Sequence, residues 1–290
     1  DILYETKKRD IPGLLVLIDF EKAFDSVSKE FINSVLLKFG FGPQIINWIN
    51  ILTYDTTSCV IQNGHISQFF SNQRGCRQGD PLSSYLFLFV AEILGCMIRQ
   101  NEEIKGIVID GIEYKLGQYA DDTELYLNGS EGSLHAAIDT LNTFYEMSGL
   151  KMNLDKTKAI WIGAKIGSRD ILCKNFAISW ESNNFEVLGI TFTPDLNDLW
   201  VINTRKRLEN INRLLSTWRK RSLTLIGKVT VIKTLALSNL VHIFNTLPNP
   251  PETFIASLEK IFFKFIWNDK IDKIKRSTMK KDYAEGGMRM

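Results

Sequence analysis

The apolar run at residues 14–18 constrains the fold most strongly. It reads LLVLI, follows Pro12-Gly13 and ends at Asp19. A short run that is apolar at every position, rather than at every second position, is typical of a strand buried on both faces. The sequence therefore predicts a sheet in which this strand is internal and is followed directly by an aspartate.

Turn signals place further strands and hairpins along the chain. Asn63-Gly64 and Asp110-Gly111 are flanked by apolar residues, as expected for two-residue hairpin turns. Residues 123–127 (TELYL) and 158–162 (KAIWI) also have strand composition. The dipeptide Asp121-Asp122 comes directly before the first of these strands. A hairpin with two aspartates at its tip is therefore predicted.

Helices are predicted between the strands. One follows Ser28 and ends at Gly40, a second follows Pro43, and residues 134–147 form another that ends at Gly149. Asp80 precedes Pro81 and is placed to cap a long apolar helix. The apolar stretch of that helix, residues 85–98, has fourteen residues and contains Glu92. Because a bilayer core is about 30 Å thick, we expect a buried core helix and no membrane partner.

The charge of the chain is divided between its two ends. Residues 1–198 carry a net charge of −9, and residues 199–290 carry +11. The basic part reads as helical to about Trp267, with an interruption at residues 247–251 and an apolar stripe that begins with Val201, Leu208, Ile211, Leu215 and Trp218. Two domains, 1–198 and 199–290, are therefore expected. An acidic region can concentrate divalent cations and a basic region can follow a phosphate backbone, although two solvated surfaces of opposite sign would have the same composition.

Three carboxylates indicate a specific chemistry. If the strand that ends at Asp19 lies beside the Asp121-Asp122 hairpin, the three side chains meet at one edge of a sheet. Carboxylates suit Mg²⁺, and two such ions can promote an in-line displacement at phosphorus. Aspartate pairs are common in exposed turns, so this pair alone is weak evidence for nucleotidyl transfer.

The order of the surrounding motifs makes the pattern specific. Residues 19–25 read DFEKAFD, 77–83 read RQGDPLS, 119–122 read YADD, 148–153 read SGLKMN and 185–190 read FEVLGI. In this order they resemble the reverse transcriptases of LINE-type, non-LTR retrotransposons, and the basic tail resembles their thumb. The resemblance implies an α+β right-hand polymerase fold, with a small antiparallel palm sheet backed by helices. It also implies partial fingers within residues 26–75 and a helical thumb.

The resemblance also implies roles for individual residues. It makes Asp19 and Asp121 the principal ligands of two Mg²⁺ ions, with Mn²⁺ as the alternative ion, and makes Asp122 the supporting carboxylate. Phe24 matches the aromatic that excludes a ribose 2′ hydroxyl, although an ordinary core phenylalanine would have the same spacing. The other residues implied to contact the substrate are Phe20, Arg77, Gln78, Gly79, Tyr119 and Ala120.

Several of these roles have simpler alternatives. Gln78 and Gly79 would also build an ordinary turn before a helix, and Arg77 could close a salt bridge instead of touching phosphate. Lys156 is a candidate general acid that protonates the departing pyrophosphate, and Lys158 competes for this role.

The expected function is RNA-directed DNA polymerisation with an RNA template, a DNA primer and deoxynucleotides as partners. Only eighteen residues precede Asp19, whereas the family that the chain resembles places much of its fingers before this aspartate. The resemblance therefore implies a fragment of a larger polyprotein that also carries an endonuclease domain. Alternatives are a catalytically silent fragment that only binds nucleic acid and an RNA-dependent RNA polymerase. No targeting signal is visible, so the expected location is nuclear or cytoplasmic.

Overall fold

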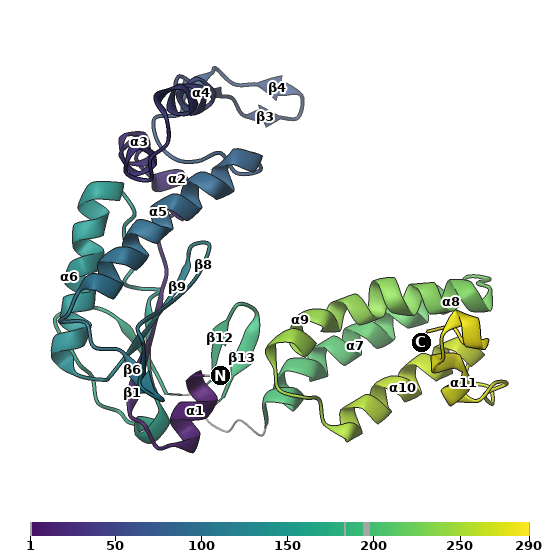
Figure 1. The fold of residues 1–290 in the computed structure, drawn as a ribbon. Coiled ribbons are helices and arrows are strands. Elements are labelled where there is room, and N and C mark those ends of the chain that lie inside the picture. The colour runs from purple at the N-terminus through teal and green to yellow at the C-terminus, as the bar shows by residue number, and fades with distance from the viewer. Residues whose placement is uncertain (1, 183, 194–197, 290) are drawn as a thin grey trace. The chain divides into compact units, whose positions relative to one another are not determined.

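The computed structural model describes residues 2–182, 184–193 and 198–289, and the chain divides into two compact units, Asp1–Asn183 and Asn184–Met290. The first unit combines a sheet with helices, and the second is mainly helical (Figure 1). This mixture confirms the predicted α+β class.

A five-stranded sheet forms the centre of the first unit. Its order is β11-β10-β1-β9-β8, with β1 at Gly13–Ile18. The other strands are β8 (Leu116–Tyr119), β9 (Asp122–Leu127), β10 (Lys158–Ile162) and β11 (Ser179–Glu181). The predicted antiparallel pairing holds for all neighbours except β10 and β11, which run parallel. After β10 the chain crosses back to the end of the sheet at which β10 begins. The next strand, β11, therefore runs in the same direction as β10, and the sheet is mixed.

The strand β1 is internal, as predicted. Its side chains alternate between the two faces of the sheet, and Leu14, Val16 and Ile18 enter the main hydrophobic core. That core is completed by the helices α5 (Pro81–Gln100) and α6 (Glu131–Ser148), which pack on each other (Figure 1). Burial on both faces explains why the run is apolar at every position.

Helix α5 is longer than the apolar stretch that predicted it. It spans 20 residues, begins at the expected Asp80 cap and, by length and composition, could cross a membrane, as could Leu225–Thr246. The expectation that this helix is too short to span a bilayer was therefore wrong, because polar residues at both ends also join it. Its buried side, which includes Leu86, Val90, Leu94 and Ile98, packs in the core of the first unit. Core helices of this kind also meet the length and composition test.

Residues 23–71 form a helical and hairpin extension of the sheet. It consists of α2 (Ala23–Ser26), α3 (Lys29–Lys38), α4 (Pro43–Thr53), β2 (Thr57–Ser58), β3 (Ile61–Gln62), β4 (His65–Ile66) and β5 (Phe70–Ser71). The predicted Asn63-Gly64 turn is confirmed, with φ of 51° and 82°. Two short strands, β3 and β4, pair across this turn, and β2 pairs with β5.

The remaining elements of the first unit are short. They are α1 (Ile2–Lys8), β6 (Ile107–Ile109), β7 (Ile112–Tyr114) and the 3₁₀ turn η1 (Gly163–Lys165). Strands β6 and β7 form the predicted hairpin around Asp110-Gly111.

The second unit is built from a hairpin and a set of helices with its own core. Its elements are β12 (Phe185–Val187), β13 (Ile190–Phe192), α7 (Leu199–Arg219), α8 (Leu225–Val231), the π-helical η3 (Ile232–Leu237), α9 (Ser238–Thr246), α10 (Glu252–Trp267), α11 (Arg276–Lys280) and η4 (Tyr283–Glu285). The predicted helical end at Trp267 is confirmed. In the predicted stripe on α7, Ile211 and Leu215 are buried, whereas Val201 is exposed and its assignment to the stripe was wrong.

The boundary between the units lies earlier than expected. The sequence predicted it after residue 198, but the β12-β13 hairpin belongs by contact to the second unit. Asn203 on α7 explains this, because its side-chain amide exchanges two 2.8 Å hydrogen bonds with the backbone of Thr191. Ile190 is also fully buried in the second core.

Candidate active site

The sheet register brings Asp19 to the Asp121-Asp122 hairpin. Ile18, the last residue of β1, pairs with Thr123, and Tyr119 pairs with Asp122 across the tip of the hairpin. Asp19 therefore follows β1 at the level of Asp122 on the neighbouring strand. The tip itself is Ala120-Asp121, and Ala120 has a positive φ of 54°. Such a conformation is uncommon for a residue with a side chain and identifies a tightly specified turn.

The charges of these aspartates interact. Burial raises the pKa of the Asp122 carboxyl, and the neighbouring Asp121 and Asp19 raise this pKa further. Among the described residues, however, no three His, Cys, Asp or Glu side chains are arranged so that they could already hold a metal ion. The carboxylates thus lie within electrostatic reach at one edge of the sheet without forming a closed ligand set. Their roles as metal ligands stay a prediction.

Residues 152–157, which are distant from Asp19 in the sequence, contact its backbone and that of Phe20. The Asp19 carbonyl accepts a 2.8 Å hydrogen bond from the Asn153 amide, and its own amide donates to the Thr157 hydroxyl oxygen at 3.4 Å. Next to it, Phe20 forms a β-bridge with Met152. Neither Asn153 nor Thr157 was predicted to hold the backbone of Asp19. Their spacing carries no signal until residues 19–21 are known to pair with residues 151–153.

The two candidate general acids, Lys156 and Lys158, have different surroundings. The Lys156 ammonium lies 3.8 Å from an Asp19 carboxylate oxygen, and 70% of its side chain is exposed. Lys158 lies in β10 and forms a 3.1 Å ion pair with Glu181. Only Lys156 of these two is therefore placed beside a predicted catalytic carboxylate.

The two phenylalanines of the first motif differ in position. Phe20 is buried in the main core, so its side chain contributes packing rather than an accessible contact for a substrate. Phe24 is only partly buried and stacks on Phe87 of α5, with ring centroids 4.3 Å apart. Phe87 thus holds the Phe24 ring in one orientation. Packing in the core and a role at the edge of the site are both compatible with this position.

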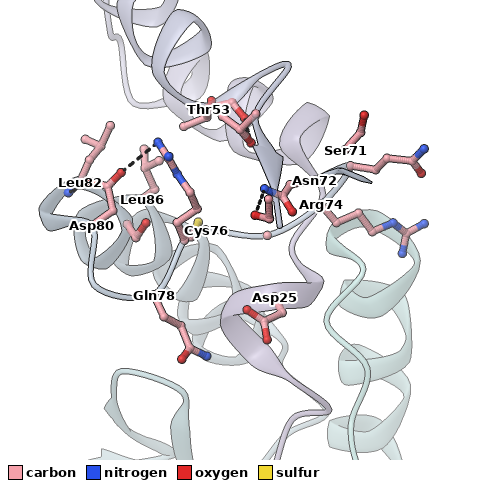
Figure 2. Close-up of a pocket in the computed structure, with 16 residues that line it drawn as sticks. Asp25, Thr53, Ser71, Asn72, Arg74, Cys76, Gln78, Asp80, Leu82 and Leu86 are labelled. Carbon is pink, nitrogen blue, oxygen red and sulfur yellow. Dashed lines mark hydrogen bonds and ion pairs between the residues drawn. The ribbon is translucent and has the colours of Figure 1, made fainter. Parts of the chain in front are cut away.

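The turn before α5 borders a polar cavity of about 730 Å³. Figure 2 shows side chains from α4, the β5 region and the turn around it. Gln78 lines this cavity and is exposed. Position 79 favours glycine because its φ is 85°, a backbone conformation that residues with a Cβ rarely adopt. The space around it is open, since a Cβ there would meet nothing within 4 Å. The described residues that line the cavity do not include Asp19, Asp121 or Asp122.

Arg77 is engaged within the protein. Its guanidinium donates to the Leu52 carbonyl at 2.9 Å and lies 3.4 Å from the Asp80 carboxylate. The salt bridge that the sequence left as an alternative is thus present. Tyr119, by contrast, is 69% exposed on the hairpin that carries the aspartates.

The chain matches a family model described as reverse transcriptase (RNA-dependent DNA polymerase) over residues 5–192. It is 26% identical over 278 residues to the transposon TX1 uncharacterized 149 kDa protein of Xenopus laevis, covering 93% of this chain and 20% of that protein. It is also 30% identical over 154 residues to a retrovirus-related Pol polyprotein from a type-1 retrotransposable element R2 of Popillia japonica. This match covers 53% of this chain and 21% of that polyprotein. The chain thus spans about one fifth of the length of these relatives.

Solved structures of telomerase also resemble the chain. One is telomerase from Candida albicans in complex with a fragment of telomeric RNA, with 12% identity, a TM-score of 0.47, and coverage of 93% of this chain and 47% of the other. A second is apo telomerase from Candida tropicalis truncated from the C-terminal domain, with 14% identity and a TM-score of 0.47. This match covers 65% of this chain and 37% of the other.

Proposed function

Because the chain belongs to the reverse transcriptase family of non-LTR retrotransposon proteins, we propose that it extends a DNA primer on an RNA template with deoxynucleotides. The observation that carries this proposal is the register that brings Asp19 beside the Asp121-Asp122 hairpin. An endonuclease domain of the same polyprotein is a further proposed partner.

The residues at the sheet edge fit the divalent metals that this family generally uses. Asp19, Asp121 and Asp122 offer hard oxygen ligands. The pKa of Asp122 is raised first by burial and then by the negative charges of Asp121 and Asp19, which a cation would neutralise. We propose that they hold two Mg²⁺ ions, with Mn²⁺ as the alternative. When bound, such ions activate an attacking hydroxyl and stabilise a leaving oxygen.

The chain's own side chains would supply the other functions. Lys156 carries a proton on its ammonium beside Asp19 and is suited to donate it to a departing pyrophosphate. The accessible backbone at Gln78-Gly79 would lie against the nucleotide and its templating base, where the absent side chain of Gly79 leaves room. Asn153 and Thr157 would keep Asp19 in place by holding its backbone.

Primer extension tests the proposed function. The 290-residue chain is supplied with a DNA primer on an RNA template, deoxynucleotides and Mg²⁺, and extended products are separated by length. We expect deoxynucleotide incorporation that stops when the metal is chelated. Binding of the template–primer duplex without incorporation would instead favour the alternative of a silent nucleic-acid-binding fragment.

Replacing Phe24 by alanine distinguishes a DNA polymerase from an RNA polymerase. The Phe24 ring is held by Phe87, so its removal should open space for a ribose 2′ hydroxyl. We expect preference for deoxynucleotides over ribonucleotides to fall by up to about 10²-fold, the range for rejecting one added hydroxyl by shape. The ratio of kcat/KM values measures this, and it does not depend on the folded fraction of the variant. An unchanged ratio would contradict the proposed role of Phe24.

A further inference from the structure

The short helix α2, which carries Phe24, depends on its neighbours for its conformation. It has four residues, Ala23–Ser26, and none of the described side chains caps its first turn. A single helical turn is unstable in water, because one hydrogen bond does not offset the loss of backbone freedom. The position of Phe24 is therefore determined by the segments that pack against this turn.

One of these segments is the chain just before α5. The Cys76 amide donates a 2.7 Å hydrogen bond to the Phe24 carbonyl, and the Gly75 amide donates a 2.8 Å hydrogen bond to the Val27 carbonyl. A Cβ on Gly75 would lie 2.7–2.8 Å from the Cα, C and O atoms of Asp25, which is too close for any side chain. Both segments border the polar cavity that Figure 2 shows. Gly75 thus permits direct contact between the two backbones.

The second segment is the end of α6. Gly149 follows this helix with a φ of 80°, and a Cβ there would lie 2.8 Å from the Ser26 carbonyl oxygen. Beside it, the Ser148 carbonyl accepts a 2.8 Å hydrogen bond from the Ser28 amide. Two glycines from distant parts of the sequence therefore approach consecutive residues of α2, at distances that leave no room for a side chain.

These contacts restrain the Phe24 ring at its backbone, and Phe87 restrains it at its face. The two rings stack with centroids 4.3 Å apart and planes 19° from parallel. A ring can reject a substrate by its shape only if it cannot move aside, so the precision of the site depends on the residues that support the ring. Because α2 is a single turn, its backbone contacts are part of this support.

We propose that Gly75 and Gly149 form a backbone clamp on α2, and that selection of deoxynucleotides over ribonucleotides depends on this clamp. The inference rests on the proposed function, in which Phe24 lies against the sugar of the incoming nucleotide. Both glycines are positioning residues, because they act through Phe24 and not by touching the nucleotide. A purely structural role would lower the stability of the chain without changing its choice of sugar.

Gly75→Ala in the 290-residue chain tests the clamp through the ratio of kcat/KM values for a deoxynucleotide and the matching ribonucleotide. We expect this preference to fall by at least about 5-fold, within the limit of about 10²-fold that shape alone supplies. An unchanged or increased preference overturns the proposal. Gly149→Ala is expected to have the same effect and carries the test if Gly75→Ala does not fold.

The matched control is Gly40→Ala. Gly40 has a φ of 81°, so alanine is strained there as well, but a Cβ would meet no described atom within 4 Å. We expect the parental preference in this variant. A fall equal to that of Gly75→Ala would assign the effect to general strain and overturn the clamp.

A double variant shows whether Gly75 acts through Phe24. In a chain that already carries Phe24→Ala, the ring is absent, and Gly75→Ala should cause no further fall in the preference for deoxynucleotides. A further fall as large as that in the parental chain would mean that Gly75 acts independently of Phe24, and the proposal would be wrong.

Hydrogen exchange separates the clamp from the proposed function, because it requires no activity. The Asp25 amide donates a 2.8 Å hydrogen bond to the Lys22 carbonyl and reports opening of α2. We expect Gly75→Ala to speed its exchange by about 5–30-fold and Gly40→Ala to leave it unchanged. Unchanged exchange in Gly75→Ala overturns the clamp whether or not the chain extends a primer. Faster exchange in a chain whose parent incorporates neither nucleotide supports the clamp and counts against the proposed function.

Discussion

Asp121→Asn is expected to lower RNA-templated primer extension by about 10²–10³-fold, the scale seen when a group that stabilises charge in a transition state is removed. Asparagine has nearly the same shape as aspartate, so the hairpin should keep its register while one carboxylate is lost. Incorporation of radiolabelled deoxynucleotide on a primed RNA template measures the effect.

The matched control for this change is Asp170→Asn. Asp170 is an exposed aspartate of the same unit, and its side chain has no partner among the residues that the structure describes. Its replacement should leave extension unchanged. A second readout does not depend on activity: because the Asp121 charge helps to raise the pKa of Asp122, Asp121→Asn should lower that pKa. Extension at the parental rate by Asp121→Asn would remove these carboxylates from the mechanism.

Local signals in the sequence predicted most of the first unit. The Asn63-Gly64 and Asp110-Gly111 turns and the Asp80 cap depend on residues that are neighbours in the chain. Each expresses a preference of the backbone or of a nearby side chain for one conformation. These features could therefore be predicted without knowledge of the tertiary structure.

Features that depend on pairing between distant segments could not be predicted in the same way. Phe20 forms a β-bridge with Met152, and the Asn153 amide donates a hydrogen bond to the Asp19 carbonyl. Both contacts join segments that lie far apart in the chain. The early boundary between the units has a similar origin, since it depends on the contact between Asn203 and Thr191. Periodicity within one segment contains no information about such partners.

The end of β1 opposite Asp19 packs closely against the end of β10, and Gly163→Ala tests this packing. Gly163 follows β10 and has a φ of 62°, and an added Cβ would overlap the carbonyl oxygen of Ile11, just before β1. Backbone strain of about 1–2 kcal/mol and overpacking of about 1–3 kcal/mol act together here. We expect the free energy of unfolding to fall by about 3 kcal/mol, as measured by urea denaturation.

Gly167→Ala is the control that separates strain from overlap. Gly167 also has a positive φ, 78°, but a Cβ there would meet nothing within 4 Å. Its replacement should cost only the strain of about 1–2 kcal/mol. If both variants lose the same stability, close approach of Gly163 to Ile11 does not contribute. A larger loss for Gly163→Ala would show that this contact tightens the end of β1 opposite Asp19, because β1 pairs with β10 along its length.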